Sequence, residues 1–346
     1  MSRAARILIA LAFVSIVAAA STAGAQSRNQ QTQTVSKPVR LAVGGKPALF
    51  YLPLTVTEQL GYFKDEGLDV QISDFSGGAR ALQSLIGGSA DVVAGAFDHT
   101  IQMQAKGQPI VGVVELGQFP GFVLAVRTAL AAAYRGPADL KGMKIGITAP
   151  GSSTHFMARY LMTQAGLKED DASFIGVGSS ASAVASVQRG EVDALVHVDP
   201  IISLLESDGA IKIVADTRTP EGTRQVFGGA YPAAVLYVTP IFAQRNPDIV
   251  QSLANAMVRG LRWIAHHSAE EIAAVMPAEY ALGDRAVYLK AIKSSLPMYS
   301  PDGRIEHEAA EVAHRILSKF DPDVQRAVIN LETTYTNAFV DKAPAR

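Results

Sequence analysis

The stretch Leu140-Lys-Gly-Met-Lys-Ile-Gly-Ile-Thr148, followed by Ala149-Pro-Gly-Ser-Ser-Thr-His-Phe156, joins a short apolar strand to the turn that opens a helix. The Pro-Gly pair ends the strand, and the three hydroxyl side chains after it stand where a helix N-cap is expected. A helix start also offers free backbone N–H groups and a partial positive charge, which suit a small anion. The segment alone therefore leaves two interpretations open, an anion site and a plain helix cap.

Strand-then-helix units of this kind repeat along the chain, which predicts an α/β fold with mainly parallel sheets. Two similar sets of units predict two lobes, with a ligand cleft at the carboxyl ends of the strands. We expect the strands at residues 39–43, 68–72, 90–94 and 110–116 in the first set, and at 143–148, 173–176, 193–196 and 211–214 in the second.

The segment after residue 233 differs, with one strand at 234–238 and then helical patterns only. Residues 119–126 and 231–238 are expected to cross between the lobes. The predicted domains are therefore a first lobe of residues 38–126 plus 234–346 and a second lobe of residues 127–233. The helical tail is expected to pack back on the first lobe.

The N-terminus has the three parts of a secretory signal peptide. Two arginines supply positive charge, residues 7–20 are almost wholly apolar, and Ala23-Gly-Ala25 has the small-x-small form of a cleavage site. We expect cleavage after Ala25, a mature protein in the periplasm, and a disordered polar leader at residues 26–37. An uncleaved membrane anchor is the alternative.

Composition excludes several function classes. The formal net charge of −1 and the lack of a basic stripe argue against nucleic-acid binding. The absence of Cys removes disulfides, thiolate nucleophiles and Cys-based metal sites. The chain has neither a Gly-x-Ser-x-Gly elbow nor a His-Glu-x-x-His motif, and His266-His267 is expected to cap or pack a helix. We therefore expect a monomeric binding protein without catalytic residues, cofactor or metal.

Short motifs in a fixed order run through the mature chain: Gly61-Tyr-Phe-Lys-Asp-Glu-Gly-Leu-Asp-Val70, Gly88-Ser-Ala-Asp91, Leu140-Lys-Gly142, Pro150-Gly-Ser-Ser-Thr-His155, Gly190-Glu-Val-Asp193 and Asp199-Pro200. In these motifs the chain resembles the periplasmic solute-binding proteins of the nitrate, sulfonate and taurine ABC importers, which share their fold with the thiamine-pyrimidine synthesis proteins. The resemblance implies a two-lobed type II periplasmic-binding-protein fold, a ligand held by hinge closure, and delivery to the permease and ATPase of an ABC importer. It also implies that the synthases of this fold use a cysteine cluster, which disfavours that enzyme here.

The first strand of the first lobe leads into a loop that should reach the cleft. Gly45 permits close backbone approach there. Phe50 and Tyr51 either wall an apolar part of the ligand or pack in the core.

The next two strand ends of the first lobe carry further candidates. Ser76 and Gly78 open a helix, and Arg80 on it is either a partner for a ligand anion or a solvated charge. Asp98 is expected to be a helix N-cap first, and a ligand contact or an Arg80 partner second.

In the second lobe, the turn that contacts the anion in the resembling family is matched by Ser152, Ser153, Thr154 and His155. His197 precedes Asp199-Pro200, where relatives usually carry an aromatic residue, which leaves the size and charge of the ligand open. We expect a small organic anion, a sulfonate or a carboxylate, with Arg80 closing over it. A nitrate-like oxyanion and a pyrimidine or thiamine precursor are the alternatives.

Overall fold

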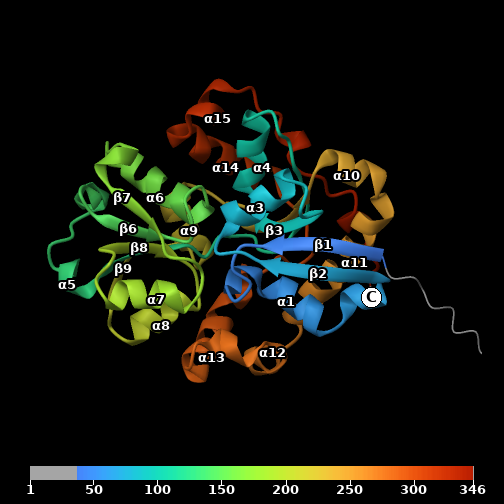
Figure 1. Cartoon of the computed structure of the whole chain (residues 1–346), viewed down its shortest axis with the longest axis horizontal. Helices are drawn as coiled ribbons and strands as arrows, with labels where there is room; N and C mark the ends of the chain where they lie inside the picture. The colour runs from blue at the N-terminus through green and yellow to red at the C-terminus, as the bar shows by residue number, and fades with distance from the viewer. Residues whose placement is uncertain (1–36, 346) are drawn as a thin grey trace, which may run out of the picture. The chain divides into compact units, whose positions relative to one another are not determined.

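Two five-stranded sheets organise residues 37–345, the part of the chain that the computed structural model describes (Figure 1). The first sheet has the order β2 (Leu68–Asp74), β1 (Lys37–Val43), β3 (Val92–Ala96), β10 (Ala234–Val238) and β4 (Val111–Glu115). The second has the order β7 (Ser173–Gly176), β6 (Lys144–Ile147), β8 (Ala194–His197), β5 (Val123–Arg127) and β9 (Ile211–Asp216). The predicted signal peptide, and the predicted leader up to Ser36, lie outside the described residues.

Each sheet contains one strand that runs against its neighbours. β10 pairs antiparallel with β3 and β4, and β5 pairs antiparallel with β8 and β9, whereas the pairs of β1 and of β6 are parallel. These are the two strands by which the chain enters one sheet after leaving the other. The predicted α/β, two-lobed fold class is confirmed, and the two crossings supply its hinge.

The predicted domain boundaries stay a prediction, with two corrections. β5 pairs within the second sheet, so residues 123–126 belong with the second lobe and not, as predicted from the sequence, with the first. Lys37, expected at the end of the disordered leader, is the first residue of β1 and pairs with Leu68.

Helices cover both sheets, as the alternating sequence pattern predicts. The first lobe contributes α1 (Leu52–Gln59), α2 (Tyr62–Asp65), α3 (Gly78–Ile86) and α4 (Asp98–Ala105). The second contributes α5 (Thr128–Ala131), α6 (Ser153–Gln164), α7 (Ala181–Gln188), α8 (Ile201–Ser207) and α9 (Pro220–Phe227). The C-terminal segment forms α10 (Pro240–Arg245), α11 (Pro247–Ala265), α12 (Ala269–Val275), α13 (Arg285–Ser295), α14 (His307–Phe320) and α15 (Pro322–Arg326). None of the helices in residues 37–345 is both long and apolar enough to cross a membrane.

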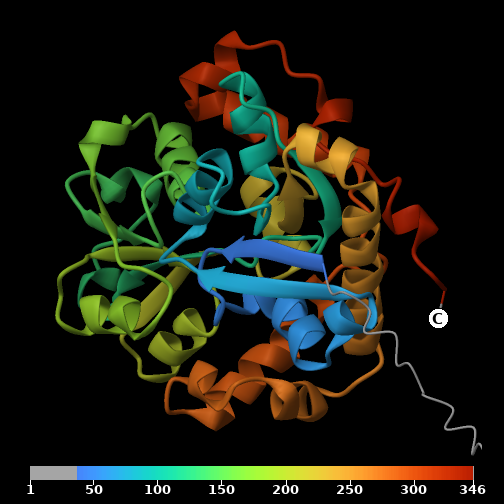
Figure 2. The same ribbon diagram turned by 45° about the vertical axis from the view of Figure 1, so that its right-hand side comes forward.

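The C-terminal helices contact both lobes, which the sequence pattern did not indicate. α11 packs on α1 and α2 of the first lobe, as expected for the tail. However, α13 also packs on α8, and α14 packs on both α4 and α6. The orange helices α12 and α13 lie below α1 in both views, and the red helices α14 and α15 lie beside α4 (Figures 1 and 2). The tail therefore bridges the two lobes.

Candidate ligand-binding site

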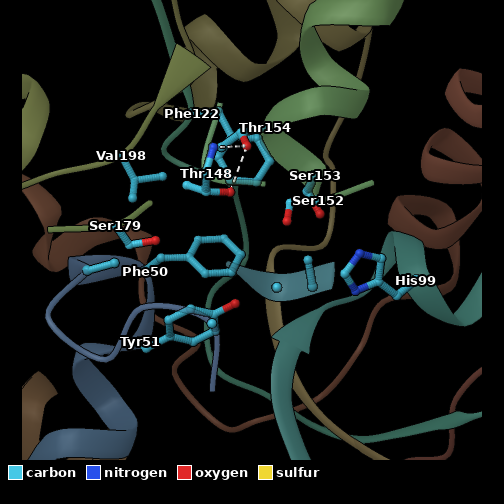
Figure 3. A pocket seen from close by; sticks show the side chains of 14 residues that line it. Phe50, Tyr51, His99, Phe122, Thr148, Ser152, Ser153, Thr154, Ser179 and Val198 are labelled. Carbon is cyan, nitrogen blue, oxygen red and sulfur yellow. Dashed lines mark hydrogen bonds between the residues drawn. The ribbon is translucent and has the colours of Figure 1, made fainter. Parts of the chain in front are cut away.

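A small cavity lies between the carboxyl ends of the two sheets. It is lined from the first lobe by Gly44, Ala48, Phe50, Tyr51, Gly78, Ala96 and His99, and from the hinge and second lobe by Phe122, Thr148, Ser152, Ser153, Thr154, Ser179 and Val198 (Figure 3). The space inside is about 30 Å³, room for on the order of one or two water-sized groups. A larger ligand therefore enters while the lobes are apart, and the lobes close on it less fully than they do in this structure.

Aromatic rings form one wall of the cavity. Phe50 and Tyr51 belong to a short 3₁₀ turn, Leu49–Tyr51, that leads into α1. The Phe50 ring stacks on Phe122 with centroids 5.4 Å apart, and Tyr51 meets Phe50 edge-on at 4.9 Å. Burial raises the pKa of the Tyr51 phenol, so it keeps its proton and remains a hydrogen-bond donor. Both predicted aromatic residues face the cavity, opposite the serines of α6 (Figure 3).

The serine and threonine hydroxyls at the start of α6 do not cap the helix. Ser152 is the N-cap residue but makes no side-chain cap bond, and its Oγ accepts from the Ala79 N–H of the first lobe at 3.0 Å. Thr154 Oγ1 accepts from the Thr148 N–H at 3.1 Å. Within residues 37–345 the backbone N–H groups of Ser153 and Thr154 have no hydrogen-bond partner. The plain helix-cap interpretation is therefore wrong, because the Ser152 and Thr154 hydroxyls accept from the N–H groups of Ala79 and Thr148 and not from N–H groups of α6.

A buried carboxylate lies directly behind Ser153. Asp98 is 1% exposed, and its Oδ1 accepts from the Ser153 hydroxyl at 2.7 Å while its Oδ2 accepts from the Tyr231 hydroxyl at 3.3 Å. Burial raises the pKa of the Asp98 carboxyl. Asp98 was predicted as an N-cap, but the N-cap of α4 is Phe97 and Asp98 is the first helical residue. Its side chain is engaged by the second lobe instead.

His99 lines the cavity and was not among the predicted site residues. Its Nε2 lies 3.3 Å from the Gly151 carbonyl oxygen, and its Nδ1 lies 3.5 Å from the Tyr237 hydroxyl. Since a carbonyl only accepts, Nε2 carries the proton and Nδ1 accepts from Tyr237. Burial lowers the pKa of His99, so the ring is neutral at physiological pH. The residue could not be singled out because it reads as one more polar residue after Asp98.

Arg80 does not face the cavity. It is exposed, and its guanidinium is 3.4 Å from Gln83 Oε1 on the outer face of α3. Gly78 and Ala79, the residues before it, occupy the inner face, and a helix turns about 100° per residue. The predicted closing of Arg80 over an anion is therefore not formed in this structure.

Two predicted residues of the first lobe contact the second lobe instead of lining the cavity. A Cβ on Gly45 would lie 2.3 Å from the Ser179 Cβ. The Ser76 carbonyl accepts from the Ser179 hydroxyl at 3.1 Å. Both therefore form the contact between lobes.

The remaining predicted residues of the second lobe turn away from the cavity. The His155 ring packs on Phe174 with centroids 4.3 Å apart, and burial lowers its pKa to about 4. His197 is fully buried, and its Nε2 lies 2.8 Å from the Gly178 carbonyl. Asp199 Oδ1 accepts from the Ser203 N–H at 2.8 Å, so this carboxylate orders the start of α8.

Phe50, Tyr51, Gly78, Ser152, Ser153 and Thr154 are thus the predicted residues that meet at the cavity. Thr148, Ser179 and Phe122 join them without having been predicted. Thr148 and Ser179 end or follow strands, which is a signal that the sequence carried, whereas Phe122 reads only as part of an apolar crossing strand. Among residues 37–345 no group of three or more His, Asp or Glu side chains could hold a metal ion.

The chain belongs to the family described as NMT1/THI5 like, whose sequence profile matches residues 51–271. Its lobes and hinge have the periplasmic-binding-protein fold. A solved structure of a Bordetella bronchiseptica RB50 protein is 46% identical, covers 88% of this chain and 96% of its own, and has a TM-score of 0.86. The alkanesulfonate-binding protein of Xanthomonas axonopodis pv. citri, solved with MOPS, is 18% identical with a TM-score of 0.67 over 87% of this chain and 98% of its own.

Curated relatives fall into two groups by name. A Bacillus subtilis binding protein, YtlA, is 25% identical over 280 residues, 79% of this chain and 80% of its own. A 4-amino-5-hydroxymethyl-2-methylpyrimidine phosphate synthase of Aspergillus parasiticus is 22% identical over 303 residues, 83% of this chain and 84% of its own. Family membership by itself therefore does not separate a binding protein from an enzyme.

Proposed function

We propose that this protein is the periplasmic substrate-binding component of an ABC importer, and that it captures a small organic ligand by closure of its two lobes. The observation that carries the proposal is the cavity itself, which both lobes line and neither completes alone. The protein would deliver the ligand to its partners in transport, a membrane permease and the ATPase of that importer. The motifs of the signal peptide support export to the periplasm.

Hydrogen bonds across the cleft support closure as the capture step. The Leu49 N–H donates to the Asp199 carbonyl at 2.8 Å, and Ser179, Ser153 and the Ala79 N–H make the bonds described above. These bonds break when the lobes separate, so the closed state has its own stabilising contacts. A ligand that touches both walls adds further contacts to the closed state. It therefore shifts the equilibrium between the open and closed states by its greater affinity for the closed one.

The chemistry of the walls describes the ligand. The Phe50–Phe122 pair and Tyr51 favour a flat apolar portion. The hydroxyls of Ser152 to Thr154 and the free N–H groups of α6 favour a hydrogen-bond-accepting end. A ligand of this kind fits the mostly apolar, few-polar-groups character of small-molecule sites.

A synthase is the second candidate, since relatives carry that name. Against it stand the absence of Cys in the whole chain and a cavity wall whose titratable side chains, Tyr51 and His99, are held in their neutral forms by burial. Both nitrogens of the His99 ring are also already engaged, by the Gly151 carbonyl and the Tyr237 hydroxyl.

A thermal-shift screen of the purified mature protein tests the proposal. A true ligand at about a hundred times its Kd adds about 2.7 kcal/mol to the free energy of unfolding. The ligand should also reduce the radius of gyration of the protein in small-angle scattering. The substitution Phe122→Ala should weaken binding of the ligand, because it removes the ring that stacks on Phe50. If no small molecule in a broad panel of sulfonates, carboxylates, amides and pyrimidines stabilises the protein, the proposed function is contradicted.

A further inference from the structure

The cavity wall carries no fixed positive charge among the described residues. Its polar lining consists of hydroxyls, the Tyr51 phenol and the neutral His99 ring, with no Lys or Arg. The start of α6 contributes a partial charge only, and that charge is worth much less than a guanidinium.

The cations nearest to the loops of the site are committed elsewhere. Lys46 Nζ lies 2.6 Å from Glu58 Oε2. The guanidinium of Arg218 lies 2.7 Å from Asp216 and 3.5 Å from Asp199. As described above, Arg80 is exposed on the outer face of α3.

A negative group lies one side chain behind the wall. Asp98 is joined to the cavity through Ser153, whose hydroxyl it binds at 2.7 Å. The titratable groups that face Asp98 are His99 beside it on α4, Tyr231 from the hinge segment, and Tyr51 and Tyr237 from the first lobe. Burial favours the uncharged form of each of these groups, and within residues 37–345 no Lys or Arg forms an ion pair with Asp98.

We infer that the ligand of this site is uncharged, and that Asp98 is the specificity-determining residue that excludes anions. An anion on the start of α6 would face Asp98 across a single hydroxyl in a water-poor cavity, where like charges interact far more strongly than in water. This inference rests on the proposed function, and it replaces the sulfonate or carboxylate expected from the sequence. An uncharged flat molecule with an amide, sulfonamide or similar polar end meets the same N–H and hydroxyl groups without that repulsion.

Matched probes of equal shape test the charge preference by calorimetry. Benzenesulfonamide and benzenesulfonate form one pair, and benzamide and benzoate form another. We expect the uncharged member to bind at least about tenfold more tightly, a difference of about 1.4 kcal/mol. Asp98→Asn keeps the shape and the bond to Ser153 but removes the charge, so it should reduce the preference about tenfold or more. Glu169→Gln, which removes an exposed carboxylate of the second lobe, is the matched control and should leave the preference unchanged.

A pH titration of the wild-type protein gives the same test without a variant, in case Asp98→Asn does not fold. Benzenesulfonate stays ionised throughout, so its binding next to Asp98 requires that the carboxyl take up a proton. Its affinity should therefore rise as the pH is lowered, because the pKa of Asp98 is raised by burial, whereas the affinity for benzenesulfonamide should stay constant.

The outcomes separate this inference from the proposed function. The role of Asp98 is overturned if the anion of a pair binds more tightly than its uncharged partner, and if its affinity is the same for wild type and Asp98→Asn or the same at both ends of the pH titration. The proposed binding function would stand in that case. If no probe and no member of the screening panel binds, both the inference and the proposed function fall.

Discussion

The two sides of the cleft meet with opposite kinds of surface. The first lobe offers bare backbone at two glycine turns, Gly44-Gly45 and Gly77-Gly78, whereas the second lobe offers the side chains of Ala149, Ser152 and Ser179. A Cβ on Gly44 would lie 2.3 Å from the Gly78 backbone, so the two turns also lie against each other. Closure of the lobes therefore depends on glycines without side chains in the first lobe as much as on the hydroxyl groups of the second lobe.

The largest effect is expected from Gly45→Ala. The new Cβ would lie 2.3 Å from Ser179 Cβ and 2.5 Å from Ser179 Oγ, distances that Cβ atoms do not tolerate, so the lobes cannot reach the closed position. Affinity for the best ligand of the screen should fall by about a hundredfold or more, about 2.7 kcal/mol, and small-angle scattering should show no compaction with ligand.

The backbone of Gly45 itself adds a second cost, since its φ is +103°. Gly88→Ala is the matched control, because Gly88 has a φ of +74° and no atom within 4 Å of its would-be Cβ. It carries a conformational strain of about 1–2 kcal/mol without any clash. If both variants lose affinity equally, the comparison between the two sides of the cleft is wrong.

A smaller loss is expected from Gly77→Ala. Its φ of 179° suits any residue, so the effect comes only from the contact. The new Cβ would lie 2.9 Å from the Ala149 Cβ and 3.2 Å from the Ser152 Oγ, which a small outward shift of the second lobe can relieve. We expect a loss of ligand affinity of about tenfold, about 1.4 kcal/mol, measured by calorimetry, with an unchanged melting temperature in the absence of ligand.

Removing a hydroxyl from the other side should act through the closed state alone. Ser153→Ala takes away one of the two hydroxyls that donate to Asp98 and leaves a buried carboxylate less satisfied. The closed state should lose about 1–3 kcal/mol, so the ligand-free protein should be more open in small-angle scattering. Ser182→Ala, which removes a hydroxyl bonded within the second lobe to the Val177 carbonyl, should not change the opening. Equal radii of gyration for wild type and Ser153→Ala would show that the hydrogen bond from Ser153 to Asp98 does not stabilise the closed state.

The smallest effect is expected from Arg80→Ala. Because Arg80 is exposed and its contact is a 3.4 Å hydrogen bond to Gln83 on the same helix, its removal should change stability by less than about 0.5 kcal/mol. Ligand affinity should stay within about twofold by calorimetry. A marked loss specific to anionic ligands would restore the anion site expected from the sequence.

The fold could be predicted because its cause is local. Strands buried on both faces, such as β3 and β10, read as continuous apolar runs, and their alternation with helices predicted both sheets. β5 was assigned to the wrong lobe, because pairing between strands distant in sequence leaves no mark in the strand itself.

The site was only half predictable for a related reason. Ser152 and Ser153 were found because they open a helix after a strand, but their partners Ala79 and Asp98 lie across the cleft. Arg80 was predicted at the correct end of α3, but its position on the helix directs the side chain away from the cavity. The sequence does not show which face of a helix start will meet the other lobe. The charge character of the cavity depends on which side chains converge there, and no local pattern contains that information.

The bridge that the C-terminal tail makes has a mechanical consequence. Arg159 on α6 donates to the Phe320 carbonyl at the end of α14 at 2.9 Å, and its guanidinium lies over the Phe320 ring at 5.0 Å from the centroid. α14 thus resists opening in addition to the hinge, because an outward movement of the second lobe has to break the contact between α6 and α14. How far the two lobes open is then set in part by the Arg159–Phe320 contact, which lies outside the lining of the cavity.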